Sequence, residues 1–239
     1  GDFMGGTALI TGGARRLGRA IALKLGEMGY HIALHYHRSR KLAEKLCEEL
    51  KSRGINCDLF QGDLRDEKVL AELIPSVVRR FDDLCLLINN ASVFERASLR
   101  ETPLSLFEHN FNVNFKAAFF LSRDFANIRK KGHIINMLDA KVAINDISYS
   151  AYTLSKMALA NFTIMAAKEL APEIRVNGIS PGYILPPEEE EKDYLVKRPE
   201  KIPIQRKGEP HEITDSIAFL VKNSFITGQI LYVDGGEHL

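Results

Sequence analysis

Thr11-Gly12-Gly13-Ala14-Arg15-Arg16-Leu17-Gly18 is the stretch of this 239-residue chain from which the fold can be predicted. The residues before it, Thr7–Ile10, are apolar or β-branched and indicate a short strand. The residues after it, Arg19–Met28, have helical periodicity, which Gly29 ends. Glycines let a backbone approach a pyrophosphate closely, and a helix amino terminus favours an anion. A glycine pair alone is weak evidence, but between a strand and a helix it predicts a dinucleotide site.

Outward from this turn, the chain alternates predicted strands and helices. Further strands are expected at His31–Tyr36, Asn56–Gln61, Leu84–Asn89, His133–Met137, Arg175–Ile179 and Ile230–Val233. Further helices are expected at Arg40–Arg53, Asp66–Phe81, Ser105–Asp124, Ala151–Leu170 and Pro210–Lys222. Strand–helix units of this length imply parallel strands joined by right-handed crossovers. We therefore expect an α/β fold, a single doubly wound parallel β-sheet with helices on both faces, in which residues 1–239 form one domain.

One stretch departs from this alternation. Pro181–Gly208 contains four further prolines and the acidic run Glu188–Glu191. It reads either as a solvated surface loop or as a lid over a ligand, since long loops in compact domains are often covers of active sites. We expect residues 183–207 to form a substrate loop.

Composition excludes several classes of protein. The chain has 32 Lys and Arg against 31 Asp and Glu, so a general nucleic-acid partner is not expected. No apolar run approaches 18 residues, and the amino terminus lacks a signal-peptide pattern, so no membrane segment or export is expected. Residues 1–3 precede Met4 and are interpreted as a cloning remnant. The three cysteines lack the spacing of metal ligands, so no metal site is expected, and their use fits a cytoplasmic location. Cys85 lies in an apolar run and is expected to be a buried thiol.

Basic residues gather at the amino-terminal end of the chain. Residues 1–41 hold seven Lys or Arg and two Asp or Glu, so this segment is basic while the remainder is acidic. The second predicted strand ends in His35-Tyr36-His37-Arg38-Ser39, without the acid that usually holds the ribose 2′-hydroxyl of NAD. Guanidinium and hydroxyl groups suit a 2′-phosphate, which favours NADPH/NADP; the alternative is an exposed basic loop.

Tyr152 and Lys156 lie four residues apart, on one face of a predicted helix. A tyrosine hydroxyl is a poor acid at neutral pH, but a nearby ammonium lowers its pKa. Such a pair can exchange a proton with a substrate. A tyrosine and a lysine at this spacing are common on protein surfaces, and the position after the fifth strand of a cofactor-binding sheet is what favours chemistry.

Taken together, these motifs resemble the short-chain dehydrogenase/reductase family over Thr7–Gly236. The matching positions are Thr11-Gly12 with Gly18, Asp63, Asn89-Asn90-Ala91, Asn114, Tyr152 with Lys156, Pro181-Gly182 and Asp234-Gly235-Gly236. The resemblance implies a Rossmann fold, a nicotinamide cofactor and a homotetramer.

Three departures from the family pattern point to its pteridine reductase branch. Arg16 replaces a glycine of the turn, Asp139 stands near the place of the usual catalytic serine, and Ser92-Val93-Phe94 follows Asn89-Asn90-Ala91 where a glycine is usual. Phe94 can stack on a flat pterin, and Asp139 suits a ring nitrogen that must gain a proton. A ketone reductase would instead need a hydroxyl, such as that of serine, to hold the substrate carbonyl. The alternative interpretation of Asp139 is a helix cap.

The resemblance also implies roles for single residues. Tyr152 with Lys156 would deliver a proton, Asp139 would orient Tyr152 and feed protons through water, and Asn114 would hold Lys156 through a water. Cofactor contacts are expected from Gly12, Arg16, Leu17, His37, Arg38, Ser39, Asp63, Leu64, Asn90, Ala91, Ser92, Tyr152, Lys156, Pro181 and Gly182. Substrate contacts are expected from Arg16, Ser92, Phe94, Asp139 and Tyr152, while Tyr149 either lines the pocket or packs in the core.

The leading hypothesis is therefore an NADPH-dependent reductase of a small pterin or of dihydrofolate. One alternative is a carbonyl reductase acting on a 3-oxoacyl or sugar ketone. Another is a non-catalytic NADP-binding sensor, since fold does not determine function. The intact Tyr152/Lys156 pair disfavours the sensor.

Overall fold

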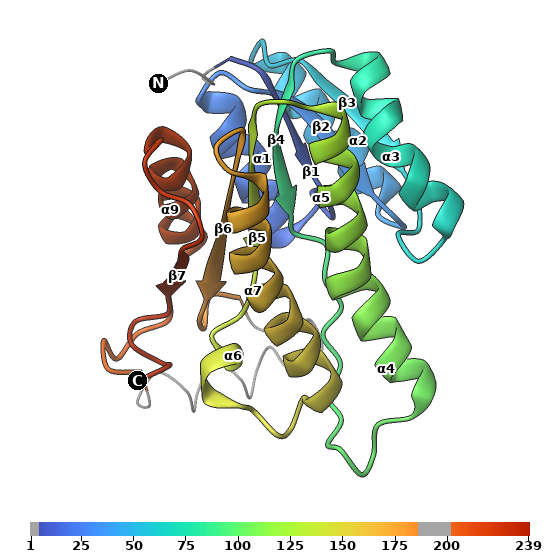
Figure 1. Ribbon diagram of the computed structural model, residues 1–239. Coiled ribbons are helices and arrows are strands. Elements are labelled where there is room, and N and C mark those ends of the chain that lie inside the picture. Colours follow the sequence, from blue (N-terminus) through green and yellow to red (C-terminus); the bar gives the residue numbers. More distant parts are fainter. Residues whose placement is uncertain (1–4, 186–201) are drawn as a thin grey trace.

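The computed structural model describes residues 5–185 and 202–239. Seven strands pair in parallel in one sheet with the order β3-β2-β1-β4-β5-β6-β7 (Figure 1). They are β1 Thr7–Ile10, β2 His31–Tyr36, β3 Cys57–Gln61, β4 Leu84–Asn89, β5 Gly132–Met137, β6 Ile174–Pro181 and β7 Ile230–Val233. The doubly wound parallel sheet predicted from the sequence is confirmed.

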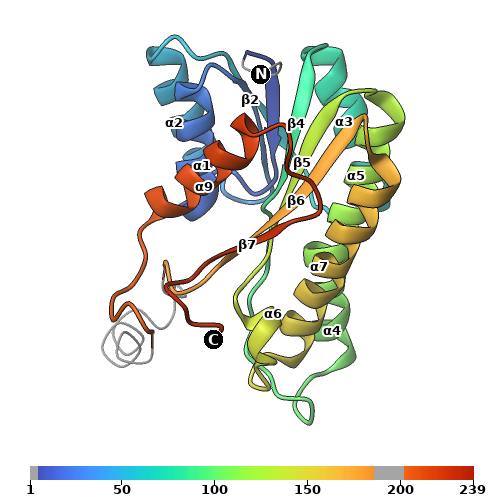
Figure 2. The ribbon, with the colours of Figure 1, turned by 60° about the vertical axis from the view of Figure 1, so that its left-hand side comes forward.

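Helices cover both faces of this sheet. They are α1 Arg16–Glu27, α2 Arg40–Ser52, α3 Glu67–Arg80, α4 Leu104–Phe111, α5 Ala117–Ile128, α6 Lys141–Ile144, α7 Ser150–Leu170 and α9 Pro210–Lys222. Figure 2 shows α1, α2 and α9 on one side of the sheet and α3, α5 and α7 on the other. Two buried apolar clusters, one under each layer of helices, make up most of the core.

The central strands explain why the sheet could be predicted closely. Every residue of β4 is buried, and so is every residue of β1 and β5. A strand covered on both faces needs apolar side chains throughout, rather than in alternation. The three cysteines are free and buried, with Cys85 inside β4 as expected.

The long helical region expected over Ser105–Asp124 is present, but its geometry changes within it. The region is α4, then a π-helical turn over Asn112–Lys116, then α5. A π-helical turn carries one more residue than an α-helical turn, and such turns often occur at functional sites. Here Asn114 is buried in the turn, with its side chain against the Val93 backbone and Ser155. Polar contacts of this kind leave no trace in apolar periodicity.

The order of strands opens a crevice at one edge of the sheet. The chain passes from β3 at one end to β4 beside β1, so the connections after β1 and β4 diverge to opposite faces. Ligands bind in such a crevice at the carboxyl ends of the strands. In the part of the chain that the structure describes, no helix is long and apolar enough to cross a membrane.

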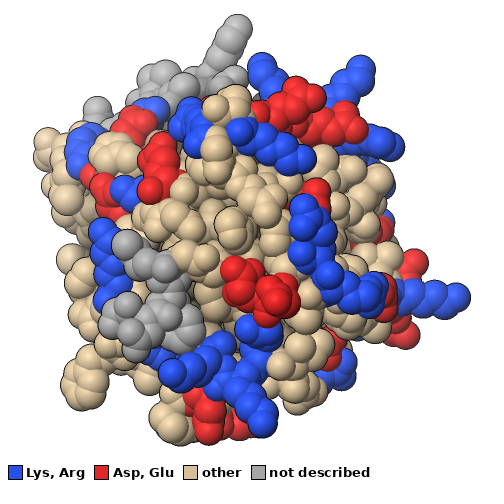
Figure 3. All heavy atoms as spheres, turned by 90° about the horizontal axis from the view of Figure 1, so that it is seen from above, with Lys and Arg blue, Asp and Glu red and all other residues tan. Residues whose placement is uncertain are grey.

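Charged residues are mixed on the face seen from above in Figure 3, where acidic and basic side chains alternate. This agrees with the near balance of charge in the composition. Within residues 5–185 and 202–239, no group of three or more His, Cys, Asp or Glu has the arrangement of a metal site.

Candidate active site

The turn after β1 is held tightly against the loop after β4. Thr11 Oγ1 accepts hydrogen bonds from the backbone N–H groups of Asn90 and Ala91, both at 3.0 Å. Asn90 Nδ2 donates to the carbonyl oxygens of Thr11 and Gly12 at 3.0 and 3.1 Å. Gly12 has φ +59°, and a Cβ there would lie 2.9 Å from the Ala91 Cα. Both the conformation and the close approach therefore require glycine at this position.

Arg16 explains one departure from the family pattern. It starts α1 with φ +52°, the left-handed conformation that glycine adopts without cost. An arginine there costs on the order of 1 kcal/mol of strain. In this position the Arg16 side chain places a guanidinium group in the lining of the cavity beside the turn.

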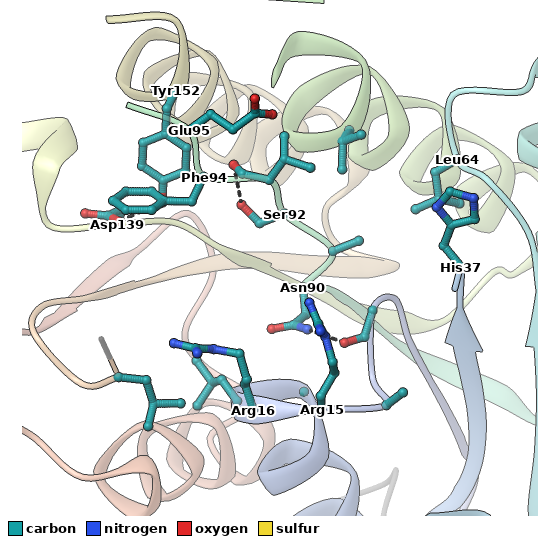
Figure 4. A pocket seen from close by; sticks show the side chains of 18 of the residues that line it. Arg15, Arg16, His37, Leu64, Asn90, Ser92, Phe94, Glu95, Asp139 and Tyr152 are labelled. Carbon is teal, nitrogen blue, oxygen red and sulfur yellow. Dashed lines mark hydrogen bonds between the residues drawn. The ribbon is translucent and has the colours of Figure 1, made fainter. Parts of the chain in front are cut away.

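A cavity of about 1000 Å³ runs along the carboxyl ends of the strands. Figure 4 shows Tyr152, Phe94 and Asp139 together at one end, His37 and Leu64 at the other, and Arg15, Arg16 and Asn90 between the ends. The predicted site residues that line it are Gly12, Arg16, Leu17, His37, Arg38, Ser39, Asp63, Leu64, Asn90, Ala91, Ser92, Phe94, Asp139, Tyr152 and Gly182. Asn114, Lys156 and Pro181 are not among the lining residues.

The His37 end of the cavity carries the basic sequence after β2. His37 and Arg38 are exposed there, and His37 Nε2 lies 3.6 Å from Asp63 Oδ2. Asp63 is paired with Arg65, whose guanidinium donates to both carboxylate oxygens. Hydrogen bonds from Arg65 hold the pKa of Asp63 well below its usual range. The imidazole of His37, the guanidinium of Arg38 and the hydroxyl of Ser39 thus line the cavity at the end of β2, with the Asp63 carboxylate beside them.

The opposite end holds a tyrosine–aspartate pair. Asp139 follows β5, and its Oδ1 accepts from the Lys141 backbone N–H at 2.8 Å. Its Oδ2 accepts from the Tyr152 hydroxyl at 2.6 Å. Asp139 therefore stabilises the turn into α6 and also accepts a hydrogen bond from Tyr152, while its catalytic role stays a prediction.

Lys156 lies one helical turn beyond Tyr152 on α7 and is buried. Its ammonium donates to the Met137 carbonyl at 2.8 Å and lies 5.9 Å from the centre of the Tyr152 ring. Burial lowers the pKa of Lys156 to about 8, and the nearby Asp139 carboxylate opposes that shift. Asn114 reaches the neighbouring Ser155 Oγ at 3.0 Å, and its water-mediated contact with Lys156 stays a prediction.

Aromatic rings form the wall beside this pair. Phe94 stacks on Tyr149 with ring centres 4.4 Å apart and meets Tyr152 edge-on at 4.7 Å. Ala97 and Tyr149 pair as an isolated β-bridge, with the Ser150 N–H donating to the Ala97 carbonyl at 3.0 Å. Tyr149 therefore both lines the cavity and packs against a neighbour.

Several lining residues were missed in the sequence. Lys141 is buried beside Asp146 at 3.1 Å, His109 pairs with Glu95 at 3.0 Å, and Glu237 approaches Gly182. Lys141 stands two residues after Asp139, which was the one available signal. Of the expected substrate loop, Tyr183 and Leu185 line the cavity, while residues 186–201 lie outside the described residues.

Comparisons with known proteins agree on the architecture and divide on the substrate. A family model described as enoyl-(acyl carrier protein) reductase matches residues 12–238. A curated relative, the 3-oxoacyl-[acyl-carrier-protein] reductase FabG of Staphylococcus epidermidis, is 31% identical, with 99% of this chain and 100% of that protein covered. The short chain dehydrogenase mdpC of Emericella nidulans is 30% identical, with 97% and 95% covered.

The similar solved structures are named for a different substrate from that of the curated relatives. The FolM alternative dihydrofolate reductase 1 of Brucella canis, complexed with NADP, superposes with a TM-score of 0.94 at 33% identity, covering 99% of this chain and 95% of that one. The corresponding protein of Brucella suis, also in complex with NADP, gives the same score and identity.

Proposed function

The chain belongs to the short-chain dehydrogenase/reductase family, and on that premise we propose that it reduces dihydropterins or dihydrofolate with NADPH. The family uses nicotinamide dinucleotides, and the cavity is large enough for a dinucleotide and a second, planar ligand. The observation that carries the substrate class is the hydrogen bond from Tyr152 to the Asp139 carboxylate at the end of β5. The structural neighbours are named as alternative dihydrofolate reductases, which supports the same class.

The residues present fit the phosphorylated cofactor. His37, Arg38 and Ser39 would surround the 2′-phosphate, since they line the His37 end of the cavity and bring an imidazole, a guanidinium and a hydroxyl. Asp63 and Leu64 would hold the adenine, and the loop after β4 the central ribose and phosphate. Lys156 would bind the nicotinamide ribose, with Pro181 and Gly182 beside the amide. When bound, NADPH supplies a hydride to the ring carbon next to the nitrogen that must be protonated.

The protein's part in the reaction is to deliver the proton. Tyr152 would hold its hydroxyl hydrogen toward Asp139 or toward the ring nitrogen N5 of the substrate. Asp139 would orient that hydroxyl and return a proton to it from solvent. Arg16 and Ser92 would contact the polar edge of the substrate, and Phe94 would stack on its ring. A ketone has no such nitrogen, which is why a carboxylate fits this substrate better than a serine hydroxyl would.

NADPH oxidation with a panel of substrates tests the proposal. The panel is dihydrobiopterin, dihydromonapterin, dihydrofolate, folate and a 3-oxoacyl thioester. We expect turnover of at least one dihydropterin or of dihydrofolate, and little with the thioester. The sequence relatives favour a second function, 3-oxoacyl reduction, and thioester turnover without pterin turnover would establish it instead. Tight NADPH binding with no turnover on any substrate would favour a sensor.

The buried ammonium of Lys156 predicts a pH limit. Its pKa of about 8 means that the charge is lost as pH rises through 8, so kcat/KM is expected to fall on that side. The unfolded state binds more protons than the native state between about pH 8 and pH 10.5, so stability against unfolding rises over that window. The two effects are separated by measuring kcat/KM against pH and, in parallel, the free energy of unfolding in urea at pH 7 to 9. A kcat/KM that stays flat to pH 9.5 would contradict the prediction that activity depends on an ammonium that loses its charge near pH 8.

We also propose that the protein is a cytoplasmic homotetramer. Phe107, Phe119, Leu154 and Met165 are each more than a third exposed on α4, α5 and α7. Pairing of these helices between two copies would bury them, as the apolar stripes of the sequence suggest.

A further inference from the structure

His35 lies against the turn after β1, near the end of β2, where it borders the cavity and is 2% exposed. Its ring Nδ1 faces the Gly12 N–H at 3.2 Å, and its Nε2 faces the Gly62 carbonyl at 3.0 Å. A backbone N–H can only donate and a carbonyl can only accept. The ring is therefore the neutral tautomer with hydrogen on Nε2, accepting from Gly12 and donating to Gly62.

The backbone of His35 contacts the same turn. The His35 carbonyl accepts the N–H of Gly13 at 2.9 Å, so the amides of both glycines are bound by one residue. On the other side, Asn90 Nδ2 donates to the carbonyls of Thr11 and Gly12. The turn is thus fixed from two directions before any ligand arrives, and a preorganised site saves the cost of ordering on binding.

The ring also connects two loops of the site. Gly62 directly precedes Asp63, which lines the His37 end of the cavity, while Gly12 belongs to the turn after β1. Burial lowers the pKa of His35 to about 4, so at neutral pH Nδ1 keeps the lone pair that Gly12 needs. An apolar side chain of similar size would fill the space but leave the Gly12 N–H without a partner.

We propose that His35 is a positioning residue for the dinucleotide, which sets the turn after β1 and the loop after β3 in register through the two nitrogens of its ring. This role rests on the nicotinamide cofactor of the family and not on the pterin substrate. It adds to the residues expected to touch the cofactor one whose ring acts through the backbone of Gly12 and Gly62.

Three variants of His35 test separately the contact of Nδ1 with Gly12 and the contact of Nε2 with Gly62. His35→Leu removes both, His35→Asn keeps an acceptor at the level of Nδ1, and His35→Gln keeps a donor at the level of Nε2. We expect His35→Leu to raise the Kd for NADPH about 10-fold or more, because an unpaired buried donor disfavours the binding conformation. His35→Asn should stay within about threefold of wild type, with His35→Gln between them. The Kd is measured by titration calorimetry without substrate.

Amide hydrogen exchange on the cofactor-free protein gives a second readout. The Gly12 amide should exchange faster in His35→Leu than in His35→Asn, and ¹⁵N chemical shifts of wild type should report the Nε2–H tautomer. Unchanged NADPH affinity and unchanged Gly12 exchange in His35→Leu would overturn the proposal. So would an equal loss of affinity in the Leu and Asn variants that follows their loss of thermal stability. Either result leaves the substrate assignment intact, because that is tested by turnover of the panel.

Discussion

Replacing Tyr152 by Phe is expected to lower kcat about 10²- to 10⁴-fold, the usual contribution of a positioned acid or base. The change removes one oxygen, the atom that donates to Asp139 at 2.6 Å, and leaves the ring that meets Phe94 edge-on. Because the ring stays in place, the Kd for NADPH should change by less than about threefold, since a hydroxyl aimed at the substrate adds little to cofactor binding. Stopped-flow turnover and calorimetric binding measure the two quantities separately.

Asp139 provides the partner experiment. Asp139→Asn keeps the shape and an acceptor for the Lys141 N–H but removes the charge, and Asp139→Ser brings in the hydroxyl found in the rest of the family. Both should abolish pterin turnover while NADPH still binds. Tyr232→Phe, a tyrosine outside the cavity lining, is the matched control and should behave as wild type. Retained dihydrobiopterin reduction in Tyr152→Phe would refute the proposed mechanism.

Replacing Arg38 by Ala is expected to raise the Kd for NADPH about 10- to 100-fold, the value of a charge-assisted hydrogen bond to a phosphate. Arg38 lines the His37 end of the cavity, where no carboxylate directly follows β2 to hold a free 2′-hydroxyl. The Kd for NADH, which lacks the phosphate, should hardly change. The ratio of the two dissociation constants is the quantity to measure.

Arg40→Ala is the control for this experiment. Arg40 is also exposed and lies two residues away, but it pairs with Glu44 at 2.8 Å and does not line the cavity. Its removal should leave both dissociation constants unchanged, apart from weak general electrostatics that added salt screens. Equal weakening of NADPH and NADH binding in Arg38→Ala would show that the arginine does not contact the 2′-phosphate.

The sequence predicted the sheet well because burial leaves a direct pattern. The bounds of β2, β4 and α9 agree with the expected ones to the residue, and each carries either a continuous apolar run or a clear amphipathic stripe. The glycine turn could be predicted on a different ground, because Gly12 adopts a backbone conformation that few other residues tolerate.

Contacts between distant polar residues left no such pattern. Asn114 contacts Val93 and Ser155 from the π-helical turn at Asn112–Lys116, and the spacing of apolar residues does not reveal such polar contacts. The two bonds of His35 connect residues 23 and 27 positions away in the chain. The hydrogen bond of Tyr152 to Asp139 follows from neither residue type alone, and it was the resemblance to a family branch that suggested it.

The bridge between Ala97 and Tyr149 has a consequence for redesign of the specificity of this protein. It joins the loop after β4 to the segment before α7, and the stacked rings of Phe94 and Tyr149 lie beside it. The two segments therefore form one wall, although 52 residues separate the bridged positions. Grafting only one of them from a relative would break the pairing and leave an aromatic ring without its neighbour. New substrate preferences should be sought by exchanging both segments in a single chimaera.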